Sequence, residues 1–286
     1  RAWIELLLGT LLGGAVGPMV KSLEMPVHAA VDLRCWIGAA ALLLLAAFRG
    51  RSIWPNGRQL ALSGLAGVLL GLHWWAFFYS LDVSSVAVGM LSMFTFPVWV
   101  SLVEPLVFGE RLKGRTVFTA VAVLGGVALI VPSWELSNAT FVGAMVGLAS
   151  AWLYVGRSLL SRRLVNEIGG VSTMIWQLLA GGLILLPTLG DLQTWPTAGD
   201  WVIVVVLGVV ISAIVHTLFV RLMVHVSAAV MGVLISAQPV VAMVAAWLWL
   251  GEVPTLRMLI GGAILLSAVG YEAAGQRGRR SGADVS

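Results

Sequence analysis

Charge is scarce in this chain. Of its 286 residues only 10% are charged and 59% are hydrophobic, whereas soluble globular domains carry about 25% charged residues. Six stretches contain no Asp, Glu, Lys or Arg, and each has about the 20 residues that an apolar helix needs to cross a bilayer: residues 59–81, 83–103, 116–134, 136–156, 168–190 and 201–220. The composition excludes a soluble enzyme and a protein that reads nucleic-acid grooves with a basic face. It predicts an integral membrane protein.

Cysteine and alternating polarity are scarce too. Cys35 is the only cysteine, so an internal disulfide and a secreted disulfide scaffold are excluded. A barrel strand needs about 10 residues of alternating polarity, but the stretches named above are apolar on every side. The fold class is therefore all-α integral membrane. Ten transmembrane helices are predicted, at about residues 3–20, 27–48, 59–78, 84–106, 116–131, 140–160, 171–189, 201–220, 227–250 and 256–274.

The Lys and Arg residues that do occur are unevenly placed. Cytoplasmic loops of membrane proteins are enriched in both, and 14 of the 17 fall at the chain ends or in even-numbered connections. That count includes Arg157, at the predicted end of the sixth helix. The odd-numbered connections hold only Lys21 and Arg257. Both termini are therefore predicted to be cytoplasmic, and the net charge of +4 is interpreted as topology and attraction to the lipid bilayer, not as nucleic-acid binding.

A repeat is visible when the sequence is aligned with itself at an offset of 142. Pro97 then falls on Pro239, and Gly109-Glu110 falls on Gly251-Glu252. Because each copy holds five helices, an odd number, the second copy enters the membrane from the opposite side and the repeats are inverted. Inverted repeats are a common plan of secondary transporters, whose substrate site lies near the membrane midplane between the halves. The predicted domains are two five-helix repeats, residues 1–135 and 136–286.

The repeated motifs also carry a family resemblance. Each Gly-Glu pair follows a proline-containing helix and precedes a helix with paired glycines, Gly125-Gly126 or Gly261-Gly262. Together with Asp32-Leu33-Arg34 at the start of the second helix, these features resemble the EamA repeat of the drug/metabolite transporter superfamily. Within it, the chain is similar to the YddG-type exporters of aromatic and other neutral amino acids. The resemblance implies a multi-pass exporter of small metabolites in the bacterial inner membrane, without cofactor or metal, acting as a monomer or homodimer.

The paired prolines are the first candidates for a substrate site. A proline in a helix interior frees a backbone carbonyl, and matching interrupted helices in two halves point to the binding site of a transporter. A kink needed only for packing is the alternative. Met90 and Phe94 share a face with Pro97, whereas Trp99 lies on a competing face with Ser92 and Thr95, and the sequence does not choose between the two. The further candidates from the second repeat are Ser236, the counterpart of Phe94, and Pro239.

Aromatic and histidine side chains supply the other candidates. Aromatic faces stack on ligand rings and attract an ammonium group, and intramembrane histidines usually face the bundle interior or a wet cavity. A place in the lipid-facing aromatic belt, or a core histidine bonded to a backbone carbonyl, is the alternative for each. The predicted topology puts the two histidines in opposite halves of the membrane, which argues against a haem between them. The candidates are His73, Phe77, Tyr79, Trp152, Tyr154 and His216.

The few remaining polar features limit the cargo. Arg34 lies roughly 12 Å along its helix from Pro26, near the limit of snorkelling to the outer surface, and is either a structural tether or a substrate ligand. With so little charge in the spans, we expect a small neutral cargo moved by alternating access. The alternatives are a proton-coupled multidrug or metabolite exporter and an intramembrane enzyme. The lack of H-E-x-x-H and G-x-S-x-G motifs argues against the enzyme.

Five glycines are expected to serve helix packing: Gly64, Gly67, Gly71, Gly143 and Gly147.

Overall fold

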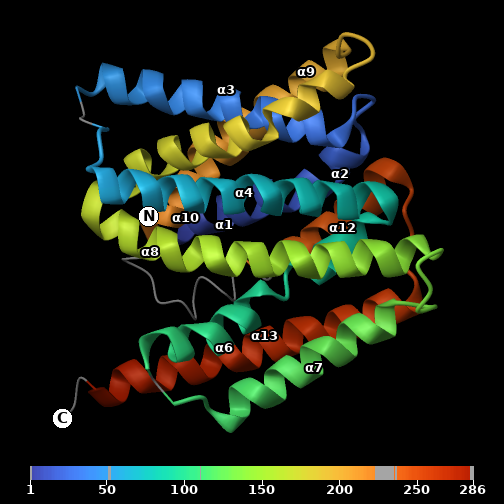
Figure 1. Cartoon of the computed structure of the whole chain (residues 1–286). Coiled ribbons are helices and arrows are strands. Elements are labelled where there is room, and N and C mark those ends of the chain that lie inside the picture. Colours follow the sequence, from blue (N-terminus) through green and yellow to red (C-terminus); the bar gives the residue numbers. More distant parts are fainter. Residues whose placement is uncertain (1, 51–52, 110, 223–234, 236, 284–286) are drawn as a thin grey trace.

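A computed structural model describes residues 2–50, 53–109, 111–222, 235 and 237–283 of the chain. The described residues form helices that run side by side (Figure 1). In chain order these are α1 (Ala2–Gly14), α2 (Val16–Lys21), α3 (Val27–Phe48), α4 (Gly57–Val83), α5 (Val86–Met93), α6 (Phe96–Phe108), α7 (Gly114–Ile130), α8 (Ala139–Leu185), the 3-10 helix η1 (Leu186–Asp191), α9 (Ala198–Val205), the π-helix η2 (Val206–His216), α10 (Thr217–Leu222), α12 (Gln238–Leu250) and α13 (Leu256–Ala283).

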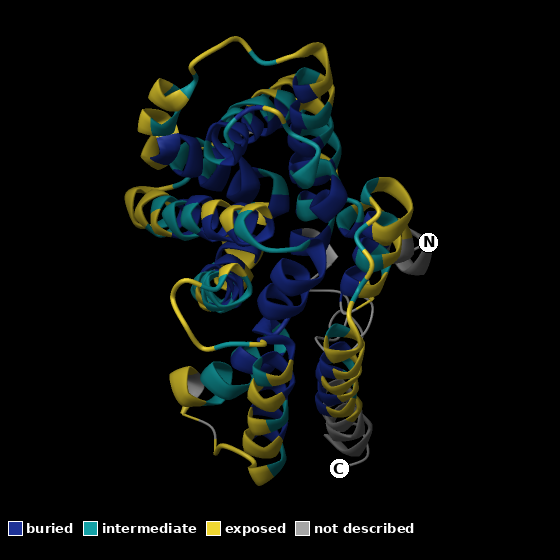
Figure 2. Ribbon diagram, turned by 90° about the vertical axis from the view of Figure 1, so that its right-hand side faces the viewer, coloured by how far each residue is buried: buried dark blue, intermediate teal, exposed yellow. Residues whose placement is uncertain are grey.

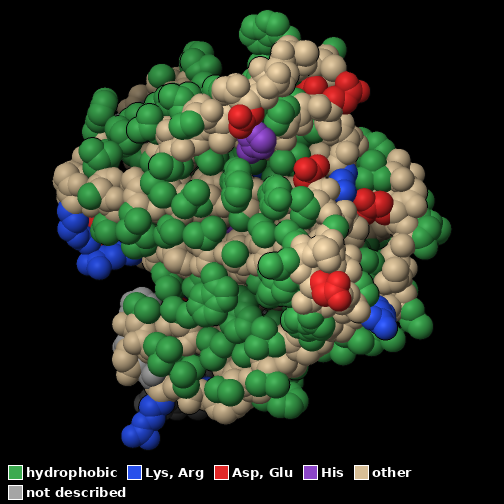
Figure 3. All heavy atoms as spheres, turned by 45° about the vertical axis from the view of Figure 1, so that its right-hand side comes forward, with side chains coloured by type: hydrophobic (Ala, Val, Ile, Leu, Met, Phe, Trp, Pro, Cys, Tyr) green, Lys and Arg blue, Asp and Glu red, His purple; other side chains and the backbone are tan. Residues whose placement is uncertain are grey.

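Several of these helices are suited to a bilayer. Five segments are long and apolar enough to cross one: Val27–Phe48, Gly57–Val83, Val86–Val107, Ala139–Asp191 and Ala198–Val220. Two shorter apolar helices, Gly114–Ile130 and Gln238–Leu250, accompany them. Apolar side chains cover most of the visible surface, whereas acidic side chains gather toward one end of the molecule (Figure 3). The structure is therefore that of an all-helical, multi-pass membrane protein.

The predicted helix boundaries need two corrections. The sixth predicted helix extends to residue 168 and meets the seventh at Gly169, whose φ of 77° and ψ of 160° are not helical, so α8 consists of two helices, residues 139–168 and 170–185. Residues 161–168, which were predicted to form the loop between them, are helical. They include Leu, Arg and Glu, which have high helix propensity, although Arg and Glu are also hydrophilic. The fourth predicted helix is divided into α5 and α6. Of the ninth predicted helix, residues 227–234 and 236 lie outside the described residues.

The helices α6 and α12 repeat one construction 142 residues apart. Each has 13 residues, a proline at its second position and a terminal glycine in the left-handed region, with φ of 72° at Gly109 and 70° at Gly251. A glycine is required there because side chains with a Cβ avoid that conformation. Pro97 and Pro239 lie in the first turn, where a missing N–H removes no intrahelical bond. The apolar span Val86–Val107 is thus interrupted just before Pro97, where α5 ends and α6 begins. Residues 223–234 and 236, which precede Pro239, lie outside the described residues.

Small residues bring the central helices together. A Cβ on Gly71 of α4 would lie 2.9 Å from the carbonyl oxygen of Gly181 in α8, and one on Gly67 would lie 2.5 Å from that of Gln177. Such distances leave room for glycine alone. Added Cβ atoms on Gly143 and Gly147 would also meet side chains below 3.0 Å, but one on Gly64 would meet nothing within 4 Å. The packing role predicted for Gly64 was therefore wrong. Burial is concentrated in the middle of the bundle (Figure 2).

Candidate functional site

A histidine on α4 is fixed by a serine on α8. His73 is 2% exposed, its Nδ1 lies 2.7 Å from the Ser150 hydroxyl and 2.9 Å from the Ser150 carbonyl oxygen, and the same hydroxyl donates to the His73 carbonyl at 3.0 Å. The imidazole also stacks on Phe77 and lies 5.1 Å from the ring of Tyr154, centroid to centroid. His73 therefore holds α4 and α8 in register while one edge of its ring contacts aromatic side chains.

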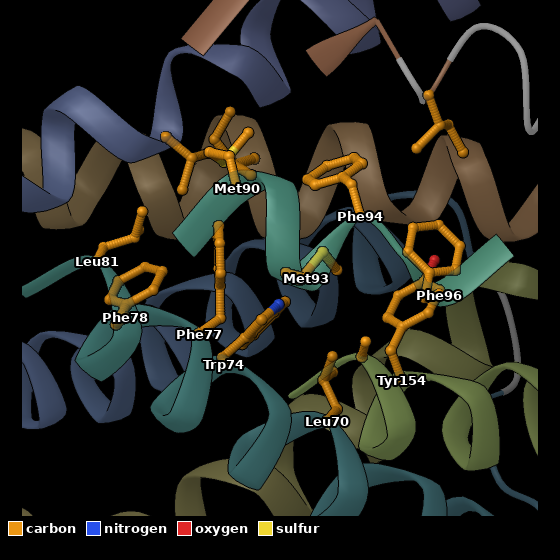
Figure 4. Close-up of a cluster of buried hydrophobic side chains, with 14 of the residues drawn as sticks. Leu70, Trp74, Phe77, Phe78, Leu81, Met90, Met93, Phe94, Phe96 and Tyr154 are labelled. Carbon is orange, nitrogen blue, oxygen red and sulfur yellow. The ribbon is translucent and has the colours of Figure 1, made fainter. Parts of the chain in front are cut away.

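Aromatic and methionine side chains fill the space between α4, α8 and the α5–α6 break. Trp74, Phe77 and Phe78 extend from α4 toward Met90 and Met93 of α5 (Figure 4). At the other end of this cluster the rings of Phe96 and Tyr154 lie 4.4 Å apart, and Phe94 lies 5.9 Å from Phe96. Methionine adapts its shape to its neighbours, so this core can repack around a ligand ring.

A second histidine joins the cluster from the other half of the chain. The ring of His216, at the end of η2, lies edge-on to Trp74 with a centroid distance of 5.2 Å. Trp74 follows His73 directly in α4, so both histidines lie close to the same indole ring. That they occupy opposite halves of the membrane stays a prediction.

Arg34 lies over one face of Trp74. Its guanidinium carbon lies 3.9 Å from the centre of the indole, and its Nε and Nη2 donate to the Ser212 hydroxyl at 3.1 and 2.9 Å. The side chain is 1% exposed, so Arg34 does not snorkel to the outer surface. A cation held over an aromatic face is favoured most where water is excluded.

A second buried arginine was not predicted at all. Arg157 is 1% exposed; its Nε donates to Oε1 of Gln177 at 3.0 Å, its Nη2 lies 3.1 Å from the sulfur of Met174, and its guanidinium carbon lies 5.5 Å from the centre of the Tyr154 ring. Its assignment to the cytoplasmic end of the sixth helix was therefore wrong, because α8 continues well past it. Its spacing gave a signal: Ser150, Tyr154 and Arg157 recur at intervals of four and three residues, which places them on one helix face.

Comparison with known proteins identifies the fold that carries this cluster. The sequence profile described as "EamA-like transporter family" matches the chain twice, over residues 2–131 and 141–271. The chain belongs to the EamA-like transporter family. Membership in this family, part of the drug/metabolite transporter superfamily, makes the protein a transporter and not an enzyme.

Relatives of this EamA-like transporter cover nearly its full length. The pseudopaline exporter CntI of Pseudomonas aeruginosa is 26% identical, with 86% of each chain covered. The threonine/homoserine exporter RhtA of Escherichia coli is 25% identical, over 92% of this chain and 88% of the relative. A solved crystal structure has a TM-score of 0.69 at 20% identity, covering 96% of this chain and 98% of the other, which indicates a shared fold.

The remaining predicted site residues of the transporter lie around the cluster or apart from it. Trp99 donates from Nε1 to the Thr95 hydroxyl at 2.9 Å and stacks on Trp152 at 5.2 Å, but Trp152 is 48% exposed. Tyr79 stacks on Trp75 on the outward face of α4, and both are more than a third exposed. The other predicted residues are buried Met90, half-buried Pro97, buried Pro239, and Ser236, which lies outside the described residues.

Burial alone does not separate the two candidate faces of the α5–α6 segment. Met90 and Phe94 are buried, and so are Ser92, Thr95 and Trp99. The two faces differ in hydrogen bonding, since Thr95 donates to the Ser92 carbonyl and accepts from Trp99. In the described part of the chain no group of three or more His, Cys, Asp or Glu residues could hold a metal ion.

Proposed function

We propose that this EamA-like transporter exports small metabolites, most favourably aromatic and other hydrophobic amino acids, by alternating access around the Trp74–His216 contact. In this proposal ten transmembrane helices form two inverted five-helix repeats, with the boundary between residues 135 and 136. The protein lies in the bacterial inner membrane with both termini in the cytoplasm. The observation that carries the proposal is that Trp74 and His216, which contact each other, are 142 positions apart in the sequence.

Residues related by a two-fold axis can touch only near that axis. Trp74 and His216 occupy equivalent positions in the two proposed repeats, so their contact supports an axis between α4 and η2. For inverted repeats the axis lies in the membrane plane, and substrate sites of such transporters lie near it. The cluster around Trp74 therefore has the depth that a substrate site needs.

The close contacts between helices also occur in pairs that are related by the 142-residue offset. A Cβ on Gly38 of α3 would lie 3.0 Å from the Gly208 carbonyl oxygen in η2. The repeat counterparts of these residues are Ala180 and Ala66, and the equivalent contact is made by Gly67, whose added Cβ would lie 2.7 Å from Cβ of Ala180. Both contacts join the second helix of one repeat to the third helix of the other, as an inverted pair requires.

One end of the bundle is closed by a contact within the first repeat and a contact between the repeats. Lys21 Nζ donates to the carbonyl oxygens of Asp82 and Ser84 at 3.0 and 2.8 Å, at the end of α4. Glu252 Oε2 accepts from the Val86 backbone N–H at 2.9 Å, at the start of α5. A cation at a helix carboxyl end and an anion at an amino end are the favourable arrangements. In the proposed topology this is the periplasmic end, and the contacts close the exit path.

The substrate assignment rests on the lining of the cluster and on the relatives. Rings of Trp74, Phe77, Phe96 and Tyr154 offer stacking surfaces for an aromatic or bulky apolar side chain. RhtA is named for threonine and homoserine, and CntI for pseudopaline. An amino-acid cargo is consistent with both the lining and the relatives.

Counterflow in proteoliposomes tests this function. Vesicles preloaded with phenylalanine, threonine, a sugar nucleotide or a cationic dye are given a trace of the same labelled compound. We expect accumulation of labelled phenylalanine without any pH gradient. Movement of the dye alone would overturn amino-acid export, and a strict requirement for a pH gradient would favour a proton-coupled exporter. Native mass measurement in detergent distinguishes a monomer from a homodimer.

A further inference from the structure

We propose that Arg34 and Arg157 bind the carboxylate groups of the cargo. This inference rests on the proposed export function and makes its substrate class more specific: the transported metabolite must present at least one carboxylate. The observation behind it is that two buried guanidiniums enter one aromatic cluster and have no acidic partner among the described residues.

Neither guanidinium pairs with a carboxylate in the described part of the chain. Four other arginines of the described chain form ion pairs: Arg58, Arg115, Arg162 and Arg163. All four are at least partly exposed, whereas Arg34 and Arg157 are buried and pair with no carboxylate among the described residues. Asp32, the acid nearest to Arg34 in sequence, accepts instead from Trp36 Nε1 at 3.0 Å. An unpaired cation in a membrane interior is costly and typically marks a functional site.

Both guanidiniums reach the same group of rings. Arg34 covers one face of Trp74, and Trp74 meets His216 and adjoins His73. Arg157 lies beside Tyr154, whose ring contacts His73. A ligand that occupied this cluster would therefore have a cation near it on the α3 side and another on the α8 side.

The present partners of the two arginines are weak and neutral. Arg34 directs two N–H donors at a single hydroxyl, that of Ser212. Arg157 directs one donor at the amide oxygen of Gln177 and another at the thioether of Met174, a weak acceptor, and it also hydrogen-bonds to the Tyr154 hydroxyl. A guanidinium has five donors in a planar fork that matches a carboxylate in two parallel hydrogen bonds. A carboxylate could therefore displace the thioether with a gain in hydrogen-bond strength.

This proposal changes the expectation for the cargo. A sequence with almost every Lys and Arg placed in loops predicts a path without fixed charge. Because Arg157 is buried in the core, the cluster holds two positive charges. A zwitterionic amino acid or an acid with two carboxylates therefore suits it better than an uncharged metabolite.

The test on the unaltered protein compares acids with their amides. Ligand-induced thermal stabilisation in detergent is titrated with phenylalanine against phenylalaninamide and with threonine against threoninamide, and each is used to compete in counterflow. We expect each acid to bind at least tenfold more tightly than its amide. Equal binding of acid and amide would overturn this inference and leave amino-acid transport intact. Acid-selective binding without counterflow would overturn the export function and support this site.

Two substitutions locate the selectivity. In Arg157→Gln and in Arg34→Gln, each checked for a single symmetric peak in size-exclusion chromatography, we expect the acid to lose at least tenfold in affinity while the amide changes less than twofold. Arg34→Lys and Arg157→Lys, which retain the charge, should lose less. Arg49→Gln, in the exposed arginine that follows α3, is the matched control and should bind as the unaltered protein does. If acid and amide weaken together in both Gln variants, the arginines are structural tethers and the inference fails.

Discussion

Trp74 and His216 meet edge to face with 5.2 Å between their ring centres, although 142 residues separate them in the sequence. One comes from the third helix of the first repeat and the other from the third helix of the second. The two residues occupy equivalent positions in the repeats but are of different types, so the two repeats contribute different side chains to the contact. An aromatic pair of this geometry contributes about 0.5–1.5 kcal/mol beyond the burial of its surface.

The Trp74–His216 contact can be tested with a double-mutant cycle. We expect Trp74→Ala, His216→Ala and the double variant to show a coupling of about 0.5–1.5 kcal/mol in unfolding free energy. Trp74→Ala should also lower phenylalanine counterflow at least tenfold, because it removes the ring that supports Arg34. The neighbouring Trp75, 38% exposed and stacked outward on Tyr79, supplies the control. Equal losses in Trp74→Ala and Trp75→Ala would contradict a site on the inner face of α4.

The hydrogen bonds between His73 and Ser150 give a second prediction. Ser150→Ala removes the hydroxyl that contacts both Nδ1 and the carbonyl oxygen of His73, and we expect a loss of about 1–3 kcal/mol in stability because buried polar groups lose a partner. Ser63 is equally buried, but its hydroxyl has no partner in the described part of the chain. Ser63→Ala should therefore be neutral or stabilising. Thermal unfolding in detergent compares the two variants, and a similar melting temperature for both would refute the bonding shown here.

A third prediction concerns the close contact of α4 with α8. Gly71→Ala places a Cβ 2.9 Å from the Gly181 carbonyl oxygen, and we expect a loss of about 1–3 kcal/mol in stability from overpacking. Gly64→Ala, in the same helix, places a Cβ in open space and should gain about 0.5–1 kcal/mol, since alanine favours helices. The melting temperatures should therefore shift in opposite directions. A shift of the same sign in both variants would show that α4 and α8 are not packed as described.

The contact of Glu252 with Val86 predicts how one end of the bundle opens. In a Cys35→Ala background, a cysteine is introduced at Val86 and labelled with a membrane-impermeant maleimide. Glu252→Ala should raise the labelling rate several-fold, because loss of a helix-capping group costs about 0.5–2 kcal/mol. Glu135→Ala changes an exposed acid whose observed bond is to Ser137 and should leave the rate unchanged. An unaltered rate in Glu252→Ala would show that this carboxylate does not hold the end closed.

Sequence reasoning recovered the architecture better than the site. Bilayer thickness sets the length of an apolar helix, so the sequence predicts the helical class. The spacing of the Pro and Gly-Glu motifs predicts the two repeats and the family. The ends of helices were harder to predict, as the helical residues 161–168 of α8 show. Arginine and glutamate are hydrophilic and also have high helix propensity, so they occur both in helices and in loops.

The arginines show why the site was only partly predictable. A hydropathy count places Arg157 at the end of a helix because charge and apolar length are its only inputs. In the fold, Gln177, 20 residues further along the chain, supplies an acceptor that makes the buried position tolerable. Such partners lie on other helices, and their approach depends on tilts and on the π-helical turn of η2, which a one-dimensional pattern does not contain.

The contacts that Lys21 and Glu252 make at one end of the bundle have a thermodynamic consequence. At the repeat offset, the counterpart of Lys21 is Arg163 and that of Glu252 is Glu110, so the sequence of each repeat carries one such cation and one such anion at equivalent positions. Arg163 is exposed here and its observed partner is Glu167, four residues away. If the two ends alternate as proposed, opening one end breaks contacts that the other end can form. The two states would then be nearly equal in free energy, and a passing substrate could shift the balance without any other source of energy.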